Sequence, residues 1–284
     1  MTFSRSTVFL LLMPALLAFA VFFVSPLATI AVESLREYVP GRVGGATNAP
    51  LTLANYGELL DPGYLRYFFA TFRLSFIASF LALLIGYPIA YLVARERSRR
   101  RRRLWISFLV GMMFLSVLVR VYSIELTFGP VGLFRHVVRW LDINPNGVNM
   151  TEAMVVAGLL HYLIPIVALT LIATVQNINP RFSEVAQSLG ASRAQAMLTV
   201  VVPLSMRGVM SAFVLCYSLS LSAFVIPMVL GKGYVLFVTN LIYSRFSEVS
   251  DWPGGAALSI TMLALSLLVV YGLMRLTQRR FDHA

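Results

Sequence analysis

The chain has 284 residues, of which 58% are hydrophobic and 12% charged, and its mean hydropathy is +0.80. A soluble domain carries about a quarter of its residues as charged side chains. This composition therefore excludes a water-exposed globule and predicts a protein that crosses a membrane several times. The single cysteine, Cys216, excludes a disulfide framework and a metal site built from several thiolates.

Six stretches are long and apolar enough to cross a bilayer as helices. We expect the first to remain as an anchor rather than act as a cleaved signal peptide, because its apolar run continues to Ile30. A polar loop broken at Gly44 and Gly45 follows it. The six stretches are 8–32, 67–94, 104–128, 153–175, 209–230 and 255–276.

The formal net charge of +11 comes from 22 arginines and one lysine. If the N-terminus is cytoplasmic, the inner loops hold 14 basic and three acidic residues, and the rest of the chain is neutral. Positive loops stay on the cytoplasmic side, so both termini are predicted inside. The basic run 95–103 is expected to stop transfer and anchor lipid headgroups, with a nucleic-acid or partner site as the alternative.

The motifs of common catalytic sites are missing from the sequence. His136, His161 and His283 lack metal-ligand spacing, and Lys232 lacks the glycine and hydroxyl residues of a phosphate-binding loop. We therefore expect no catalytic residue, no metal site and no cofactor in this chain.

The loop 179–203 carries the most specific pattern. Asn179 and Pro180 suit the start of a helix whose apolar stripe is Phe182, Val185, Ala186 and Leu189. Gly190 suits a left-handed helix end, and Ser192 with Gln195 forms a capping box that opens a second short helix. The second stripe is predicted at Ala194, Met197, Leu198 and Val201, with Pro203 closing the unit.

This segment resembles the EAA loop of ABC-importer permeases. Their pattern is Glu-Ala-Ala, three residues, Gly, nine residues, then Ile-x-Leu-Pro. Here Glu184-Val-Ala186, Gly190 and Val200-Val-Val-Pro203 stand at the same spacing. The segments 86–91, 118–123, 219–227 and 251–256 look like those of spermidine/putrescine-type permeases. In this chain Ala223 stands where many polyamine-type members carry an acid.

The resemblance implies an all-α membrane protein with the type I importer permease fold, in which six transmembrane helices carry a cytoplasmic helix–turn–helix coupling loop. It implies a bacterial inner-membrane location and alternating-access import of a small organic solute, polyamine-like or a related cationic or amino compound. The implied partners are a second homologous permease, two cytoplasmic ATPases that bind ATP and Mg²⁺, a periplasmic solute-binding protein and membrane lipids, without nucleic acid. The residues assigned to coupling are Phe182, Glu184, Val185, Ala186, Leu189, Gly190, Ser192 and Pro203.

Candidates for the solute pathway are charged and aromatic residues inside the predicted crossings. An ionisable group in a bilayer is costly and usually faces a cavity. Glu125 fits a cation site or an interfacial position, and Arg120 fits the pathway or a bond to a neighbouring helix or subunit. Tyr122, Tyr217 and Phe224 suit stacking on a solute or plain packing.

The predicted organisation is an N-terminal transmembrane helix (1–32), a periplasmic loop (33–66), a permease core of five crossings (67–276) and a cytoplasmic tail (277–284). Two other function classes stay open. A stand-alone carrier or channel would leave the apolar stripes of the 179–203 loop unexplained. A membrane-embedded lipid-modifying enzyme would need clustered polar groups at one membrane face.

Overall fold

The computed structural model describes residues 5–41, 50–140, 144 and 147–281. The expected breaks at Gly44 and Gly45 and the last three residues of the tail lie outside these ranges. The described residues form helices and turns, with one isolated antiparallel bridge between Arg36 and Leu51 and no named strand. The prediction of an all-α protein is confirmed for this part of the chain.

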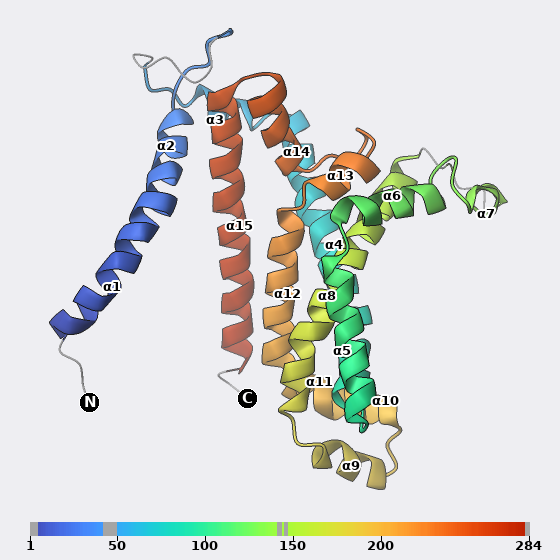
Figure 1. The fold of residues 1–284 in the computed structure, drawn as a ribbon. Coiled ribbons are helices and arrows are strands. Elements are labelled where there is room, and N and C mark those ends of the chain that lie inside the picture. Colours follow the sequence, from blue (N-terminus) through green and yellow to red (C-terminus); the bar gives the residue numbers. More distant parts are fainter. Residues whose placement is uncertain (1–4, 42–49, 141–143, 145–146, 282–284) are drawn as a thin grey trace. The chain divides into compact units, whose positions relative to one another are not determined.

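The helices differ widely in length, and three turns are π-helical (Figure 1). In chain order the elements are α1 (Arg5–Phe19), η1 (Ala20–Val24), α2 (Ser25–Glu33), α3 (Ala54–Glu58), α4 (Pro62–Ala94), α5 (Arg99–Phe114), α6 (Val117–Phe128), α7 (Arg135–Trp140), α8 (Val148–Gln176), α9 (Arg181–Ser188), α10 (Arg193–Ala196), η2 (Met197–Val201), α11 (Val202–Leu204), α12 (Met206–Leu221), α13 (Val225–Leu230), α14 (Val238–Tyr243), η3 (Ser244–Glu248) and α15 (Trp252–Phe281).

Among the described residues, four helices are long and apolar enough to cross a membrane: Leu11–Glu33, Pro62–Ala94, Val148–Gln176 and Trp252–Arg275. Two bent pairs raise the number to six if each pair is one span. One pair is α5 with α6, bent by 90°, and the other is Arg193–Leu204 with α12, bent by 78°. The predicted stretches 104–128 and 209–230 are each interrupted, the first between α5 and α6 and the second between α12 and α13.

The chain divides into two compact units. The first contains the described residues up to Leu65 with Leu241–Leu265, and the second contains Arg66–Asn240 with the residues from Ser266 onward. The large hydrophobic core belongs to the second unit and is built on α8, which buries Val155, Leu159, Leu163 and Val167 completely.

In the second unit, α4 packs on α8 through small side chains. Ala78, Ala82 and Ala90 are fully buried on α4. A Cβ on Gly86 would lie 2.7 Å from Cγ1 of Val167, so only glycine allows the two helices to approach this closely. Small residues at crossing points are typical of helices that associate within a bilayer. The sequence segment 86–91 is therefore part of a helix-packing surface.

Candidate functional site: two broken helices and an exposed helical pair

The break between α5 and α6 is held by Arg120. Its Nη2 atom donates to the carbonyl oxygens of Met112 (2.5 Å), Met113 (3.0 Å) and Leu115 (2.6 Å), which end α5. The guanidinium lies 5.9 Å from the ring centroid of Tyr162, and Arg120 is 4% exposed. Non-helical backbone within a membrane protein needs its polar groups satisfied internally. The contacts of Arg120 therefore favour its structural interpretation over a place on an open pathway.

The break between α12 and α13 follows from a proline. Pro227 has no N–H to donate to the carbonyl of Ala223, four residues earlier. The hydroxyl of Thr239 donates to that carbonyl instead (2.7 Å), and Nδ2 of Asn240 donates to the carbonyl of Phe224 (3.0 Å). Residues of α14 thus supply the hydrogen bonds that the interrupted helix lacks.

The two broken helices are joined by an ion pair. Oε1 of Glu125, on α6, lies 2.9 Å from Nζ of Lys232, in the turn after α13, and both side chains are mostly buried. Lys232 has φ 49, a backbone conformation that non-glycine residues rarely adopt, and it stands between Gly231 and Gly233. The second carboxylate oxygen, Oε2 of Glu125, is buried without a hydrogen-bond partner. The sequence analysis did not assign Lys232 to this site, and its only signal was that it is the sole lysine of the chain.

The other pathway candidates differ in their surroundings. Tyr122 is exposed, whereas Tyr217 is 3% exposed and stacks on Phe213 with ring centroids 5.9 Å apart. Phe224 immediately precedes α13. No group of three or more His, Cys, Asp or Glu residues placed to hold a metal occurs within the described ranges, and His283 lies outside them.

The Glu125–Lys232 pair yields a prediction. Glu125→Gln leaves the Lys232 ammonium in a mostly buried position without its counterion. The interaction free energy that is lost corresponds to about a tenfold change in an equilibrium constant. If Glu125 lies on a solute pathway, as the sequence resemblance implies, we expect uptake to fall about tenfold while the amount of folded protein in the membrane stays unchanged. The matched control is the double variant Glu125→Gln/Lys232→Met, which removes both charges.

Uptake and assembly measured for both variants separate the two interpretations of Glu125. If the carboxylate contacts solute, uptake stays low in the double variant. Recovery of uptake in the double variant would assign the pair to structure alone, and normal uptake in Glu125→Gln would remove Glu125 from the site.

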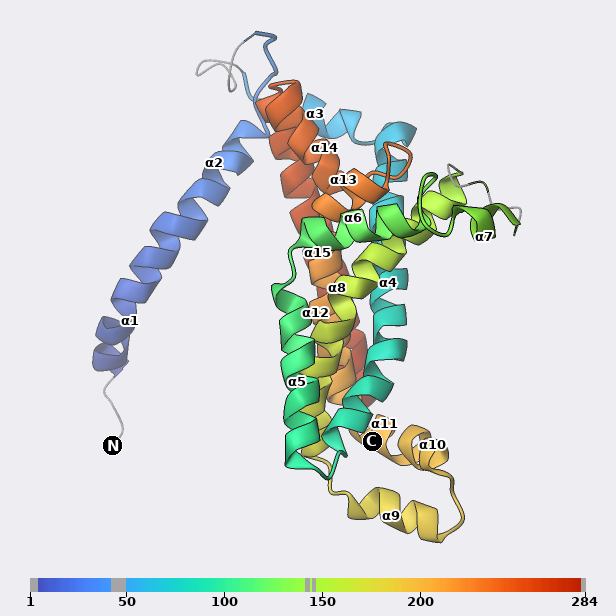
Figure 2. The same ribbon diagram turned by 45° about the vertical axis from the view of Figure 1, so that its right-hand side comes forward.

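A pair of short helices, α9 and α10, lies at the end of the second unit opposite α6 and α13 (Figures 1 and 2). Gly190 joins them with φ +97, as the sequence predicts. The capping box is present: Ser192 N–H donates to Oε1 of Gln195 (2.8 Å), and Gln195 N–H donates to Oγ of Ser192 (3.2 Å). Asn179 also accepts, at Oδ1, from the N–H of Arg181 (3.0 Å). Local sequence signals therefore determine this helix–turn–helix.

The apolar stripe of α9 faces outward. Phe182, Val185 and Leu189 are 55%, 57% and 84% exposed, and Glu184 stands exposed in the first turn. Ala186 is half-buried. Exposing three large apolar side chains on so short a helix does not stabilise the unit by itself. Such a patch is typical of an interaction surface.

The second predicted stripe is partly wrong. Ala194 and Leu198 are exposed, whereas Ala196 and Val201 are fully buried. The reason is the π-helical turn η2, whose wider spacing puts residues five apart on one face. Met197 is half-buried, and Pro203 lies in the short helix α11 that precedes the bend into α12.

At the start of α9, the second unit ties the helical pair to its neighbours. Nη2 of Arg95, just after α4, donates to the carbonyl of Ile178 (3.0 Å). At the other end of the pair, the hydroxyls of Tyr87 on α4 and Ser205 form a buried hydrogen bond of 2.8 Å. Both ends of the segment are thus attached to α4.

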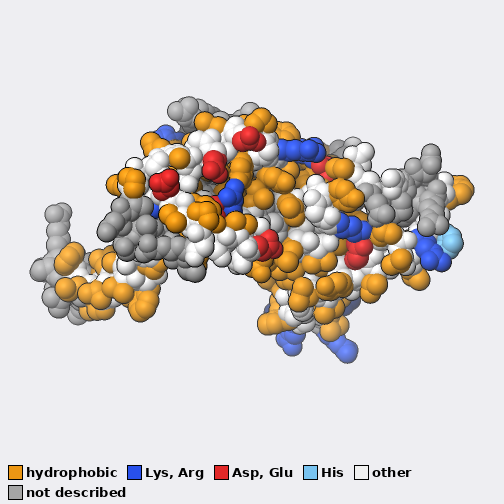
Figure 3. Space-filling model, turned by 90° about the horizontal axis from the view of Figure 1, so that it is seen from above, with side chains coloured by type: hydrophobic (Ala, Val, Ile, Leu, Met, Phe, Trp, Pro, Cys, Tyr) orange, Lys and Arg blue, Asp and Glu red, His pale blue; other side chains and the backbone are white. Residues whose placement is uncertain are grey.

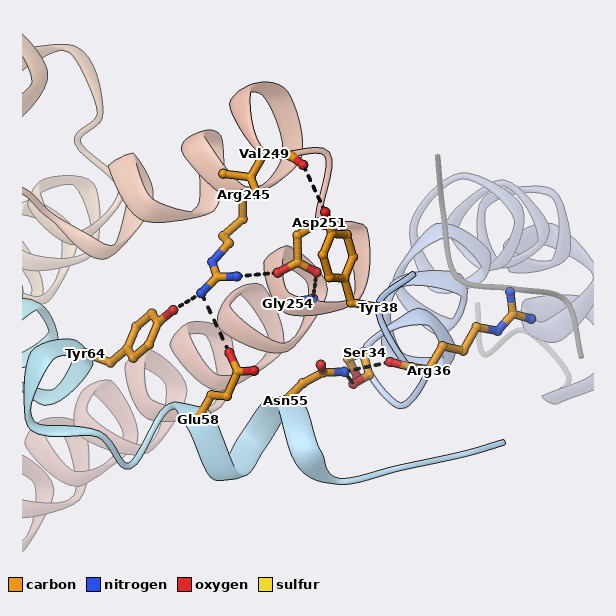
Figure 4. Close-up of polar contacts among 10 residues, drawn as sticks. All are labelled: Ser34, Arg36, Tyr38, Asn55, Glu58, Tyr64, Arg245, Val249, Asp251 and Gly254. Atoms are coloured by element: carbon orange, nitrogen blue, oxygen red, sulfur yellow. Dashed lines mark hydrogen bonds and ion pairs between the residues drawn. The ribbon is translucent and has the colours of Figure 1, made fainter. Parts of the chain in front are cut away.

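The first unit contains a polar cluster centred on Arg245, which was absent from the predicted site (Figure 4). Arg245 lies 2.5 Å from Oδ2 of Asp251 and 3.7 Å from Oε2 of Glu58, and it also donates to the hydroxyl of Tyr64. Asp251 accepts from the N–H of Gly254 (2.9 Å), which caps the start of α15. The segment 251–256 therefore serves as a helix cap that is anchored to the loop before α4.

A second set of contacts joins α3 to the segment that follows α2 within that unit. Nδ2 of Asn55 donates to the carbonyls of Ser34 (2.9 Å) and Arg36 (2.8 Å). On the face shown in Figure 3, acidic and basic side chains lie among hydrophobic ones.

Among the described residues, the long apolar helices have the length and composition of a polytopic membrane protein, and interrupted helices are common in transport proteins. Residues 86–283 match the family described as the binding-protein-dependent transport system inner membrane component. That match covers more than half of the chain, and the chain belongs to this family.

Two relatives of this chain are spermidine/putrescine transport system permease proteins. The chain is 28% identical over 236 residues to the spermidine/putrescine transport system permease protein PotB of Escherichia coli K12, covering 81% of this chain and 86% of that protein. It is 30% identical over 239 residues to PotB of Haemophilus influenzae, covering 82% and 83%. The resemblance to spermidine/putrescine-type permeases is confirmed.

Solved structures confirm the fold. A chain of a bacterial ABC transporter involved in importing the acidic polysaccharide alginate aligns with a TM-score of 0.70 at 17% identity, covering 96% of this chain and 95% of that one. A chain of the MetNI methionine ABC transporter aligns with a TM-score of 0.56 at 15% identity, covering 77% and 94%.

Proposed function

We propose that this chain is a permease subunit of an ATP-driven importer that moves a small organic solute from the periplasm to the cytoplasm by alternating access. The observation that carries the proposal is the exposed apolar stripe Phe182, Val185 and Leu189 on α9, in a chain of the binding-protein-dependent transport family. Such a stripe needs a partner surface, and a cytoplasmic ATPase is the partner that converts ATP hydrolysis into movement of the helices behind it.

The proposed route of coupling runs from α9 into the core. In this proposal, a movement of α9 is transmitted to α10 through Gly190. It then reaches α4 through the buried hydrogen bond between Ser205 and Tyr87. Two ATPases, a second homologous permease and a periplasmic solute-binding protein complete the proposed assembly. ATP and Mg²⁺ belong to the ATPases, and this chain contributes no catalytic residue.

The proposed solute is polyamine-like or a related cationic or amino compound. Two features support this class: the names of the relatives that are 28–30% identical and the carboxylate of Glu125, which already binds an ammonium group in Lys232. Ala223, in place of an acid, leaves Glu125 as the pathway carboxylate that we assign to this chain.

The proposed orientation places both termini and the α9–α10 pair in the cytoplasm, and the Arg245 cluster with the loop 33–66 in the periplasm, where it would receive the binding protein. The asymmetry of the arginines supports this choice. Reporter fusions after Arg103 and after Ala284, which lies outside the described residues, are both expected to report cytoplasm. A periplasmic signal from either fusion would overturn this orientation.

The ATPase contact is tested by reversing the charge at the start of α9. Glu184 complements the helix dipole by about 0.3–1 kcal/mol, and it is exposed beside Phe182 and Val185. We expect Glu184→Lys to weaken co-purification of the ATPase several-fold while the permease still inserts. Glu248→Lys, an exposed charge reversal in the first unit, is the matched control. Equal ATPase recovery with Glu184→Lys and wild type would contradict a contact at α9.

A further inference from the structure

A groove lies on the first two turns of α5. It has a volume of about 370 Å³ and is lined by Arg101, Leu104, Trp105 and Phe108. These positions follow helical i, i+3, i+4, i+7 spacing, so they form one stripe along the helix. The rings of Trp105 and Phe108 meet edge to face with centroids 6.4 Å apart, and both are more than half exposed. The groove is thus apolar along its length and cationic at one end.

The cationic end is strongly charged. Residues 99–103 are five consecutive arginines at the start of α5. Among the described residues, their one ion pair joins Nη2 of Arg101 to Oε1 of Glu96 at 3.1 Å. The first turn of α5 holds no acidic residue. Basic side chains at the start of a helix oppose its dipole. Since Glu96 pairs with only one of the five arginines, this end of the groove keeps a net positive charge.

The groove lies at the end of the second unit that also carries α9 and α10, since α5 begins at that end in both views (Figures 1 and 2). In a bilayer the arginines remain at the headgroup level, while the residues from Leu104 onward enter the apolar region. Tryptophan is enriched at that boundary. Along the groove, a cationic end formed by arginines is therefore followed by the indole of Trp105 and then by an apolar wall.

We propose that this groove binds one anionic phospholipid. The phosphate lies against Arg101 and the neighbouring arginines, and an acyl chain lies along Leu104, Trp105 and Phe108. Charge complementarity selects an anionic over a zwitterionic lipid, because a choline or ethanolamine headgroup adds a cation beside the arginines. This inference does not depend on the transported solute.

Native mass spectrometry of the assembled, delipidated transporter tests the stoichiometry and selectivity. Titration with phosphatidylglycerol is expected to fill one site about fivefold more tightly than phosphatidylcholine, the selectivity that the attraction of one basic residue to an anionic lipid gives. Arg101→Gln should abolish this preference, whereas Trp105→Ala, which removes part of the acyl-chain wall, should weaken the binding of both lipids. Arg181→Gln, which removes an arginine away from the groove, is the matched control and should retain the preference. Equal binding of the two lipids by wild type, unchanged selectivity in Arg101→Gln, or unchanged binding of both lipids in Trp105→Ala would overturn the proposal.

Tryptophan fluorescence tests the location. In the full-length variant Trp140→Phe/Trp252→Phe, Trp105 is the only tryptophan. In vesicles of equal total composition, brominated phosphatidylglycerol is expected to quench it more strongly than brominated phosphatidylcholine. Equal quenching would place the lipid elsewhere. If the chain alone binds the selective lipid but the assembled transporter does not, another subunit covers the groove. That result would also overturn the proposal.

Discussion

Gly190→Val is expected to abolish solute-stimulated ATP hydrolysis by the reconstituted transporter while the permease still inserts in the membrane. Gly190 has φ +97, and no atom lies within 4 Å of the position of an added Cβ. The effect of the substitution is therefore confined to the backbone. A β-branched residue held at this φ costs on the order of 1–3 kcal/mol, which is enough to open the turn between α9 and α10.

The control for this prediction is Gly190→Asn. Asparagine tolerates positive φ better than valine does, and the open surroundings of Gly190 accommodate its side chain. We expect Asn to retain most of the stimulation. Wild-type stimulation in the valine variant would show that the turn is not part of the coupling route.

Arg120→Met is expected to destabilise the permease itself. It removes three hydrogen bonds from a buried guanidinium to the carbonyls that end α5. A hydrogen bond involving a charged group contributes about 1.5–3 kcal/mol, and the carbonyls left behind at the 90° bend lose their donors. We expect a lower yield of folded protein and a lower midpoint of thermal unfolding, measured by size-exclusion chromatography after heating.

Arg73→Met is the matched control for Arg120→Met. Arg73 on α4 is paired with Glu152 on α8, but its side chain is 40% exposed, and exposed ion pairs contribute about 0–1 kcal/mol. We expect Arg73→Met to leave the unfolding midpoint close to that of wild type. Equal midpoints for the two variants would contradict the role of Arg120 at the bend.

Local signals in the sequence predicted the parts of the fold that depend on neighbouring residues. The long apolar stretches became α4, α8 and α15, and Gly190 and the Ser192–Gln195 box formed as expected. The bend after Phe114 was not predicted, because Gly111, the nearest glycine, lies inside α5 and the apolar run continues through residues 117–119. The π-helical turn η2 likewise has no recognised sequence signal, so the second stripe was assigned at the wrong phase.

Contacts between residues that are far apart in the sequence could not be predicted either. Glu125 was a candidate, but its partner Lys232 stands in a turn that follows the broken helix α12–α13. Pro227 removes a backbone donor there, and the donors that satisfy the free carbonyls, Thr239 and Asn240, become neighbours only in the folded chain. The Arg245 cluster was missed for the same reason, since its carboxylates come from both Glu58 and Asp251.

The most direct test of the proposed function is purification of the intact complex from membranes through a tag on this chain, followed by reconstitution in proteoliposomes. We predict that an ATPase, a second permease and this chain are recovered together, and that ATP hydrolysis rises when the solute-loaded binding protein is added. Recovery of the chain without an ATPase, together with solute uptake that needs no ATP, would contradict this account and identify a stand-alone carrier.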